Sequence, residues 1–182
     1  MRPVTIHPGH PFLDPEGERR PVRRLRARLP APVTVWGSAG PDPGVEARAG
    51  LTVSSLLVAD GEPARVLGLV DEESELWTVL RRSGACAVSL LGTADRQVAD
   101  AFAGLTPSPG GVFRTGTWVD TAWGPVLAER SFVGGRLVST EPREVGWSLL
   151  VELGVEHVEL AEGGLDTGAL VHHRGRYMAP DG

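Results

Sequence analysis

The chain has 182 residues, of which 41% are hydrophobic and 23% charged, the balance of an ordinary single-core globular domain. Its net charge of −5 argues against a general electrostatic affinity for nucleic acid or anionic membranes, which both attract basic surfaces. The only cysteine, Cys86, excludes an internal disulfide.

Residues 1–20 carry several prolines and glycines with little apolar periodicity, which predicts a flexible N-terminal arm. They lack the apolar segment of a signal peptide, and no stretch of the sequence is long and apolar enough to span a bilayer. We therefore expect a cytoplasmic protein with one folded domain over residues 21–178.

A short helix is expected over residues 21–29. Proline suits the first helical position, and three apolar residues recur on one face: Val22, Leu25 and Leu29. Six arginines between positions 19 and 28 resemble a nucleic-acid patch. In an acidic chain, a solvated helix face that lines the entrance of a ligand site is the favoured interpretation.

From Pro32 onward, short strands separated by turn residues predict a barrel or a sandwich. In one of these strands small polar and apolar side chains alternate, so one face is buried and the other presents hydroxyl groups. The expected strands cover residues 33–36, 51–58, 64–70, 84–91, 126–140, 146–160 and 169–173.

Two further helices are expected between the strands. The first has Ser74 as its N-cap, carboxylates near its first turn and Gly84 as its stop. The second has Thr93 as its N-cap and Gly104 as its terminator.

The sequence supplies no protein-borne catalytic group. It has no glycine-rich phosphate loop, no Gly-x-Ser-x-Gly elbow and no cluster with metal-ligand spacing, so no metal is expected. His172 and His173 adjoin on an expected strand, so their side chains point to opposite faces. Cys86 lies in an apolar run and is expected to be buried. Catalysis would therefore need a bound cofactor.

Six segments form a recognisable series of motifs. In this order they resemble the flavin reductase-like, FMN-binding split barrels over nearly the whole chain, from about Val22 to Tyr177. The resemblance implies a mainly β protein with flanking helices, folded as a split β-barrel. The segments are an opening strand at 29–35, Gly-Leu-Thr-Val-Ser-Ser-Leu at 50–56, Leu-Arg-Arg-Ser-Gly-Ala-Cys-Ala-Val-Ser-Leu-Leu at 80–91, Gln-Val-Ala-Asp-Ala-Phe-Ala-Gly at 97–104, Leu-Gly-Val-Glu-His at 153–157 and Ala-Leu-Val-His-His-Arg-Gly-Arg-Tyr at 169–177.

The resemblance also implies a flavin site. A strand with short hydroxyl side chains suits the flavin ring, because it offers polar groups to the ring edge without covering the ring. The implied contacts to the ring and the ribityl chain are Thr52, Val53, Ser54 and Ser55. The phosphate is expected near Ser74, where a helix N-terminus favours an anion. His157 is expected to contact flavin or nicotinamide; a histidine with no such role is an equal alternative.

The activity that the resemblance implies is the reduction of FMN, with FAD as the alternative, and with NAD(P)H as co-substrate. It also implies a homodimer with FMN at its interface and, as a candidate partner, a flavin-dependent monooxygenase. No nucleic-acid or membrane partner is expected. Two alternatives stay open: a split barrel that binds flavin or a related cofactor without turnover, and a barrel that serves as a non-catalytic interaction module.

The chain departs from the family pattern at the expected phosphate position. Ser74-Glu75-Leu76 stands where the family commonly has Ser-Arg-Thr or Ser-Lys-Thr. The surrounding carboxylates oppose anion binding: Asp71, Glu72, Glu73 and Glu75. The candidates for a compensating positive charge are Arg48, Arg65 and the arginines of the N-terminal helix.

Overall fold

A computed structural model describes residues 21–40, 48–161 and 168–180 of the protein. The arm expected over residues 1–20 lies outside the described residues. In the described ranges, no helix has both the length and the apolar character that a membrane crossing requires.

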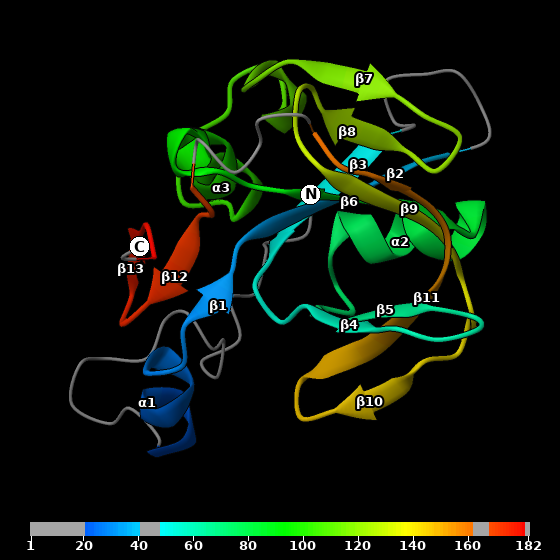
Figure 1. The fold of residues 1–182 in the computed structure, drawn as a ribbon, viewed down its shortest axis with the longest axis horizontal. Coiled ribbons are helices and arrows are strands. Elements are labelled where there is room, and N and C mark those ends of the chain that lie inside the picture. Colours follow the sequence, from blue (N-terminus) through cyan, green and yellow to red (C-terminus); the bar gives the residue numbers. More distant parts are fainter. Residues whose placement is uncertain (1–20, 41–47, 162–167, 181–182) are drawn as a thin grey trace, which may run out of the picture.

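The main element is one antiparallel sheet that curls into a half-barrel (Figure 1). Along the sheet the strands follow the order β3-β2-β6-β9-β11-β5-β4, with β10 beside β11. The curl brings β3 against β5. The expected split β-barrel is therefore confirmed. The strands are β2 (Thr34–Ala39), β3 (Arg48–Val53), β4 (Leu57–Ala59), β5 (Arg65–Val70), β6 (Ala85–Leu90), β9 (Phe132–Leu137), β10 (Arg143–Val145) and β11 (Ser148–Glu159).

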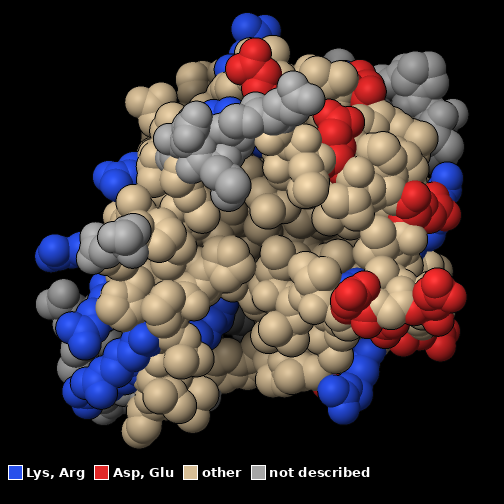
Figure 2. Space-filling view, in the orientation of Figure 1, with Lys and Arg blue, Asp and Glu red and all other residues tan. Residues whose placement is uncertain are grey.

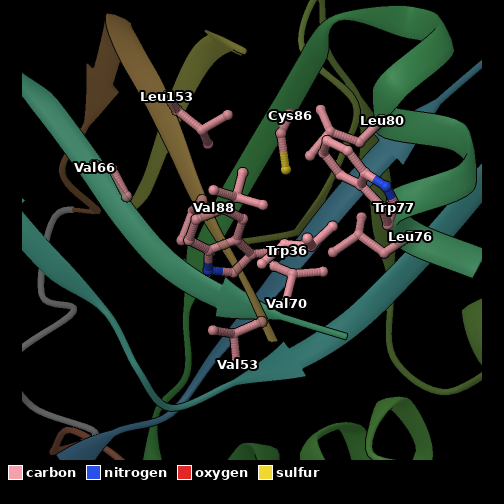
Figure 3. Packing of buried hydrophobic residues seen from close by; sticks show 12 residues of the cluster. Trp36, Val53, Val66, Val70, Leu76, Trp77, Leu80, Cys86, Val88 and Leu153 are labelled. Atoms are coloured by element: carbon pink, nitrogen blue, oxygen red, sulfur yellow. The ribbon is translucent and has the colours of Figure 1, made fainter. Parts of the chain in front are cut away.

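The concave side of the sheet holds the main core (Figure 3). Trp36 lies at its centre with no exposed surface. Helix α2 (Glu75–Ser83) packs against β2 and β3 and adds the side chains of Leu76, Trp77 and Leu80 to this core. As expected, Ser74 caps α2 and Gly84 ends it in the left-handed conformation.

A second layer covers the convex side of β2, β3 and β6. It comprises α3 (Arg96–Phe102), the short turns η2 (Thr93–Asp95) and η3 (Val112–Arg114), and the hairpin of β7 (Trp118–Asp120) and β8 (Pro125–Leu127). Three aromatic rings join these pieces with centroids 4.9–5.2 Å apart: Phe102, Phe113 and Trp118.

The two ends of the described chain meet beside the barrel (Figure 1). Helix α1 (Pro21–Ala27) leads into β1 (Ala31–Pro32), which pairs with β12 (Val171–His173). Strand β13 (Arg176–Met178) completes this three-stranded sheet. The Arg174 amide donates to the Ala27 carbonyl at 2.6 Å and so ties α1 to the β12–β13 turn.

The strand expected over 51–58 is two strands, because the chain changes partners at Ser54. Strand β3 pairs with β2, whereas β4 pairs with β5. At the break, the Ser55 hydroxyl accepts from the Leu69 amide at 2.8 Å and donates to its carbonyl at 3.3 Å. This side chain replaces the backbone bonds that would have continued the β4–β5 ladder.

Two other expectations were wrong. The segment 126–140 is divided between β8 and β9 by a turn at Glu129, whose φ is +60°. Thr93 is the first residue of η2 rather than an N-cap. The expected N-terminal helix forms over Pro21–Ala27, and its apolar side faces solvent, since Val22 and Leu25 keep 76% and 61% of their surface exposed.

Candidate functional site

The hydroxyl run at the end of β3 is only partly available to a ligand. The Thr52 hydroxyl points to the convex side and donates to the Ala99 carbonyl of α3 at 2.7 Å. Val53 points the other way and is buried in the barrel core. Since the Ser55 hydroxyl is bound to Leu69, two of the three hydroxyls serve the fold.

Ser54 differs from its neighbours. Its side chain is half-buried, and among the described residues no hydrogen-bond partner lies within reach of its hydroxyl. Residues 54–56 belong to no strand, so their backbone groups stand outside the β3 and β4 ladders. This bend is the part of the predicted run that keeps polar groups for a ligand.

Ser74 lies at the same end of the barrel as Ser55. Leu69, which binds Ser55, is followed by Val70 and then by the loop that leads to Ser74. The Ser74 hydroxyl accepts from the Trp77 amide at 3.2 Å and donates to the Asp71 carbonyl at 2.6 Å. The Asp71 carboxylate accepts from the Glu73 amide at 2.9 Å.

These bonds occupy donors that a phosphate would use at a helix N-terminus. The chain's own Asp71 already takes the Glu73 amide, and Glu75 complements the helix dipole in the first turn. The start of α2 is therefore a capped, acidic helix end. It holds Ser74 near Ser55 but supplies no positive side chain to an anion.

His157 lies at the other end of the barrel. Leu69 pairs with Leu150 of β11, and His157 comes seven residues later on that strand. At about 3.3 Å per residue, it lies roughly 23 Å along β11 from the Ser55 end. Within one chain, the structure does not bring His157 together with the other predicted site residues.

The His157 ring instead belongs to an aromatic cluster on the convex face. It stacks on Trp123 with centroids 4.9 Å apart and an interplanar angle of 12°. Phe132 lies 5.4 Å away, and the Glu159 carboxylate 3.7 Å from Nε2. The neighbouring Glu156 carboxylate accepts from the Trp123 indole at 2.7 Å, and this bond lowers the pKa of Glu156.

The sequence names the arginines of the N-terminal helix as candidates for a compensating charge, but it does not show that cations from the other end of the chain lie beside them. We call residues 21–32 and 168–180 the basic lobe. A cavity of about 440 Å³ in this lobe is lined by the β12–β13 hairpin: His173, Arg174, Arg176, Tyr177 and Met178. Figure 2 shows Arg side chains gathered at the lower left, over α1, beside a hollow in the molecule.

The charged and titratable groups of this lobe lie close enough to influence one another. Burial lowers the pKa of His172, and the positive charges of Arg26 and His173 lower it further. The ring of His172 contacts that of Tyr177 at 5.7 Å. Burial, followed by the nearby Asp100 carboxylate, raises the pKa of Tyr177 to about 12. Arg26 of α1 therefore lies close enough to the C-terminal hairpin to act on its titration.

No group of three or more His, Cys, Asp or Glu side chains able to hold a metal occurs in the described ranges. Cys86 is fully buried, as expected, and burial raises the pKa of its thiol far above the ordinary range. Neither observation offers a catalytic group on the protein itself.

The curled sheet with its bend at Ser54 defines a split barrel of the flavin reductase type. Residues 26–180 match the family described as Flavin reductase like domain, and the chain belongs to this family. The flavin oxidoreductase expected from the sequence is confirmed at the level of the family.

Known relatives cover nearly the whole chain. The 4-hydroxyphenylacetate 3-monooxygenase reductase component of Pseudomonas aeruginosa is 28% identical over 152 residues, 82% of this chain and 86% of that protein. Among solved structures, the NADH:FAD oxidoreductase SgcE6 of Streptomyces globisporus C-1027 has a TM-score of 0.76 at 21% identity, covering 93% of this chain and 98% of that one. Flavin reductase PheA2 also has a TM-score of 0.76, at 19% identity, covering 91% and 99%.

Proposed function

We propose that this chain is an NAD(P)H-dependent flavin reductase that takes FMN, or alternatively FAD, and passes reduced flavin to a separate monooxygenase. The observation that carries the proposal is the bend at Ser54, where the flavin reductase barrel keeps a half-buried hydroxyl and backbone groups outside any ladder. Such groups match the hydrogen-bonding edge of a flavin ring.

The residues at this end fit the cofactor in size and polarity. Ser54 is small enough to leave a flat ring uncovered, and its hydroxyl can donate or accept a bond. When bound, flavin supplies the redox chemistry: a hydride comes from NAD(P)H and a proton from water, giving NAD(P)⁺ and reduced flavin. The chain binds the ring edge, orients it and limits access of water, so that proximity provides most of the rate.

The names of relatives support the co-substrate and the partner. SgcE6 is described as an NADH:FAD oxidoreductase, and another structure of it is in complex with NAD and FAD fragments. The Pseudomonas relative is the reductase component of a monooxygenase. BorF, with a TM-score of 0.72, is the flavin reductase component of a two-component tryptophan halogenase.

We further propose a homodimer in the cytoplasm, where reduced nicotinamide nucleotides are available. Apolar side chains support the dimer: Leu57 and Val58 on the edge strand β4 each keep 67% of their surface exposed. The separation along β11 adds a second argument. If His157 contacts the cofactor that Ser54 binds, it does so from the other copy.

Two measurements on the purified full-length chain test the function. Flavin fluorescence titration should give a saturable affinity for FMN or FAD, and the oxidation of NADH or NADPH at 340 nm should depend on added flavin. Flavin binding without NAD(P)H oxidation would show a binding protein without turnover. The absence of any flavin binding would leave the interaction module and overturn the proposal.

A further inference from the structure

The charges of this chain are divided unequally between the barrel and the basic lobe. Residues 21–32 and 168–180 contain six arginines and two histidines but no aspartate or glutamate, although acidic residues outnumber basic ones 23 to 18 in the whole chain. Strand pairing of β1 with β12 and the Arg174–Ala27 bond hold the two segments together. The cations are Arg23, Arg24, Arg26, Arg28, Arg174 and Arg176, with His172 and His173.

The basic lobe has a cavity as well as charge. The cavity of about 440 Å³ combines Arg174 and Arg176 with the His173 ring and the half-buried Tyr177. Guanidinium groups bind phosphate oxygens through paired, charge-assisted hydrogen bonds, and an apolar floor strengthens such bonds. The chemistry of this lining suits a phosphate ester that carries an organic group.

The lobe lies next to the bend that we propose for the flavin ring. Val53 pairs with Thr34, and the chain two residues before Thr34 is Pro32 of β1, which pairs with Val171 of β12. About two strand spacings, roughly 10 Å, therefore separate the end of β3 from Val171 at the start of β12, and His173 and Arg176 lie two residues further along the hairpin. A five-carbon ribityl chain, or the sugar of a nicotinamide nucleotide, spans a distance of this order.

The other place for a phosphate is unfavourable. At the start of α2, the Asp71 carboxylate already accepts the hydrogen bond of the Glu73 amide, and the exposed carboxylates of Glu72 and Glu75 add negative charge. An anion at Ser74 would face these charges. At the basic lobe the nearby carboxylate is Asp100, beside Tyr177, and the lobe itself contributes six arginines and no aspartate or glutamate.

We propose that the basic lobe binds the phosphate groups of the nucleotide used by the proposed reductase. The principal charges are Arg176, which lines the cavity, and Arg26 of helix α1, whose end is bonded to the hairpin through Ala27 and Arg174. The inference rests on the proposed function. The shared chemistry is a phosphate ester, and its source is either the flavin or the nicotinamide nucleotide.

The test compares ligands with and without phosphate on the full chain. Riboflavin carries the ring and ribityl chain of FMN but no phosphate, so the ratio of the two affinities reports the phosphate contact alone. The test variant is Arg26→Gln combined with Arg176→Gln. The matched control is Arg81→Gln with Arg82→Gln, which removes two exposed charges from the far end of α2.

If the flavin phosphate binds in the lobe, the test variant weakens FMN about tenfold and leaves riboflavin within twofold, while the control changes neither. If the nicotinamide nucleotide supplies the phosphate, the same variant weakens NADH or NADPH instead and leaves FMN unchanged. The proposal would be overturned if the test variant had unchanged affinities for all these nucleotides, or if it lost affinity only for the monooxygenase partner.

Binding of inorganic pyrophosphate, measured by calorimetry, separates this inference from the function. A chain that binds pyrophosphate through Arg26 and Arg176 but binds no flavin would refute the proposed reductase and keep the phosphate site. A chain that binds riboflavin and FMN equally, with no affinity for pyrophosphate, would refute the phosphate site and keep the proposed reductase.

Discussion

At the residue scale, Ser54 carries the hydroxyl of the run at 52–55 that has no hydrogen-bond partner among the described residues, and we propose it as a flavin contact. We expect Ser54→Trp to fill the space beside the bend and to weaken FMN binding by more than tenfold. Ser54 takes part in no ladder, so the unfolding temperature should change little. Fluorescence titration and thermal unfolding measure the two effects.

The matched control is Ser139→Trp, at an exposed site in the loop before β10. It should leave FMN affinity unchanged. If Ser54→Trp binds FMN as well as the wild type does, the flavin ring does not lie at this bend.

Asp95 is a buried charge with a structural role. With 7% of its surface exposed, it accepts two bonds from Arg130, at 2.7 and 3.0 Å, and one from the Gly92 amide at 2.7 Å. Removing one partner of such a pair leaves the other charge uncompensated. We expect Asp95→Ala to lower the free energy of unfolding by about 2–4 kcal/mol in urea titrations.

Arg130→Met offers a comparison, because it removes the positive charge and keeps much of the side-chain volume. It should also destabilise the fold, and the double variant should lose less than the sum of the single losses. Additive losses would mean that the pair contributes nothing through its mutual contact.

Cys86 has no exposed surface and its thiol pKa is raised by burial, so the reactive thiolate is scarce in the folded protein. We expect Ellman's reagent to modify this thiol at neutral pH only after unfolding in urea. Rapid modification of the native protein, at the rate of a free thiol, would contradict the buried position.

At the scale of elements, two glycines on the neighbouring strands β9 and β11, Gly135 opposite Val155 and Gly154 opposite Arg136, make a matched pair. A Cβ on Gly135 would lie 2.6 Å from the Gly154 carbonyl oxygen, a backbone atom that cannot move aside. A Cβ on Gly154 would meet its nearest atom, the end of Arg65, at 3.5 Å. We expect Gly135→Ala to cost about 1–3 kcal/mol in urea unfolding and Gly154→Ala to be nearly neutral. Equal losses of unfolding free energy in the two variants would show that β9 and β11 can move apart at Gly135 without cost.

Element patterns predicted most of the fold because their signals are local. The cap at Ser74, the stop at Gly84 and the strand over residues 146–160 each depend on neighbours in sequence, and each is confirmed. The break at Ser54 was missed because it depends on a distant residue. The Leu69 amide, fourteen residues after Ser55, donates a hydrogen bond to the Ser55 hydroxyl. Apolar periodicity continues across such a break without a change.

The candidate site was harder to predict for the same reason. A hydroxyl run in the sequence does not reveal that the Thr52 hydroxyl donates a hydrogen bond to the Ala99 carbonyl, or that the Ser55 hydroxyl accepts one from the Leu69 amide. The positive charges of α1 and of the C-terminal hairpin are about 150 residues apart and meet only through β1–β12 pairing. Their joint field is a property of the fold.

At the scale of the whole molecule, the exposed apolar residues predict an association between two copies. Strand β4 ends the sheet order, so one of its edges is unpaired within the described sheet, and its side chains Leu57 and Val58 are largely exposed. We expect sedimentation to give a dimer at micromolar concentration. Leu57→Glu should shift it toward the monomer, because a charge at the centre of an apolar contact loses its hydration.

Leu105→Glu is the control, since Leu105 is as exposed as Leu57, at 66% against 67%, and lies after α3, away from β4. This variant should remain dimeric. If His157 acts across the dimer, His157→Ala should weaken flavin or nicotinamide binding in the dimer and have no effect in the Leu57→Glu monomer. A wild-type chain that sediments as a monomer at all concentrations would remove both the dimer and any shared role for His157.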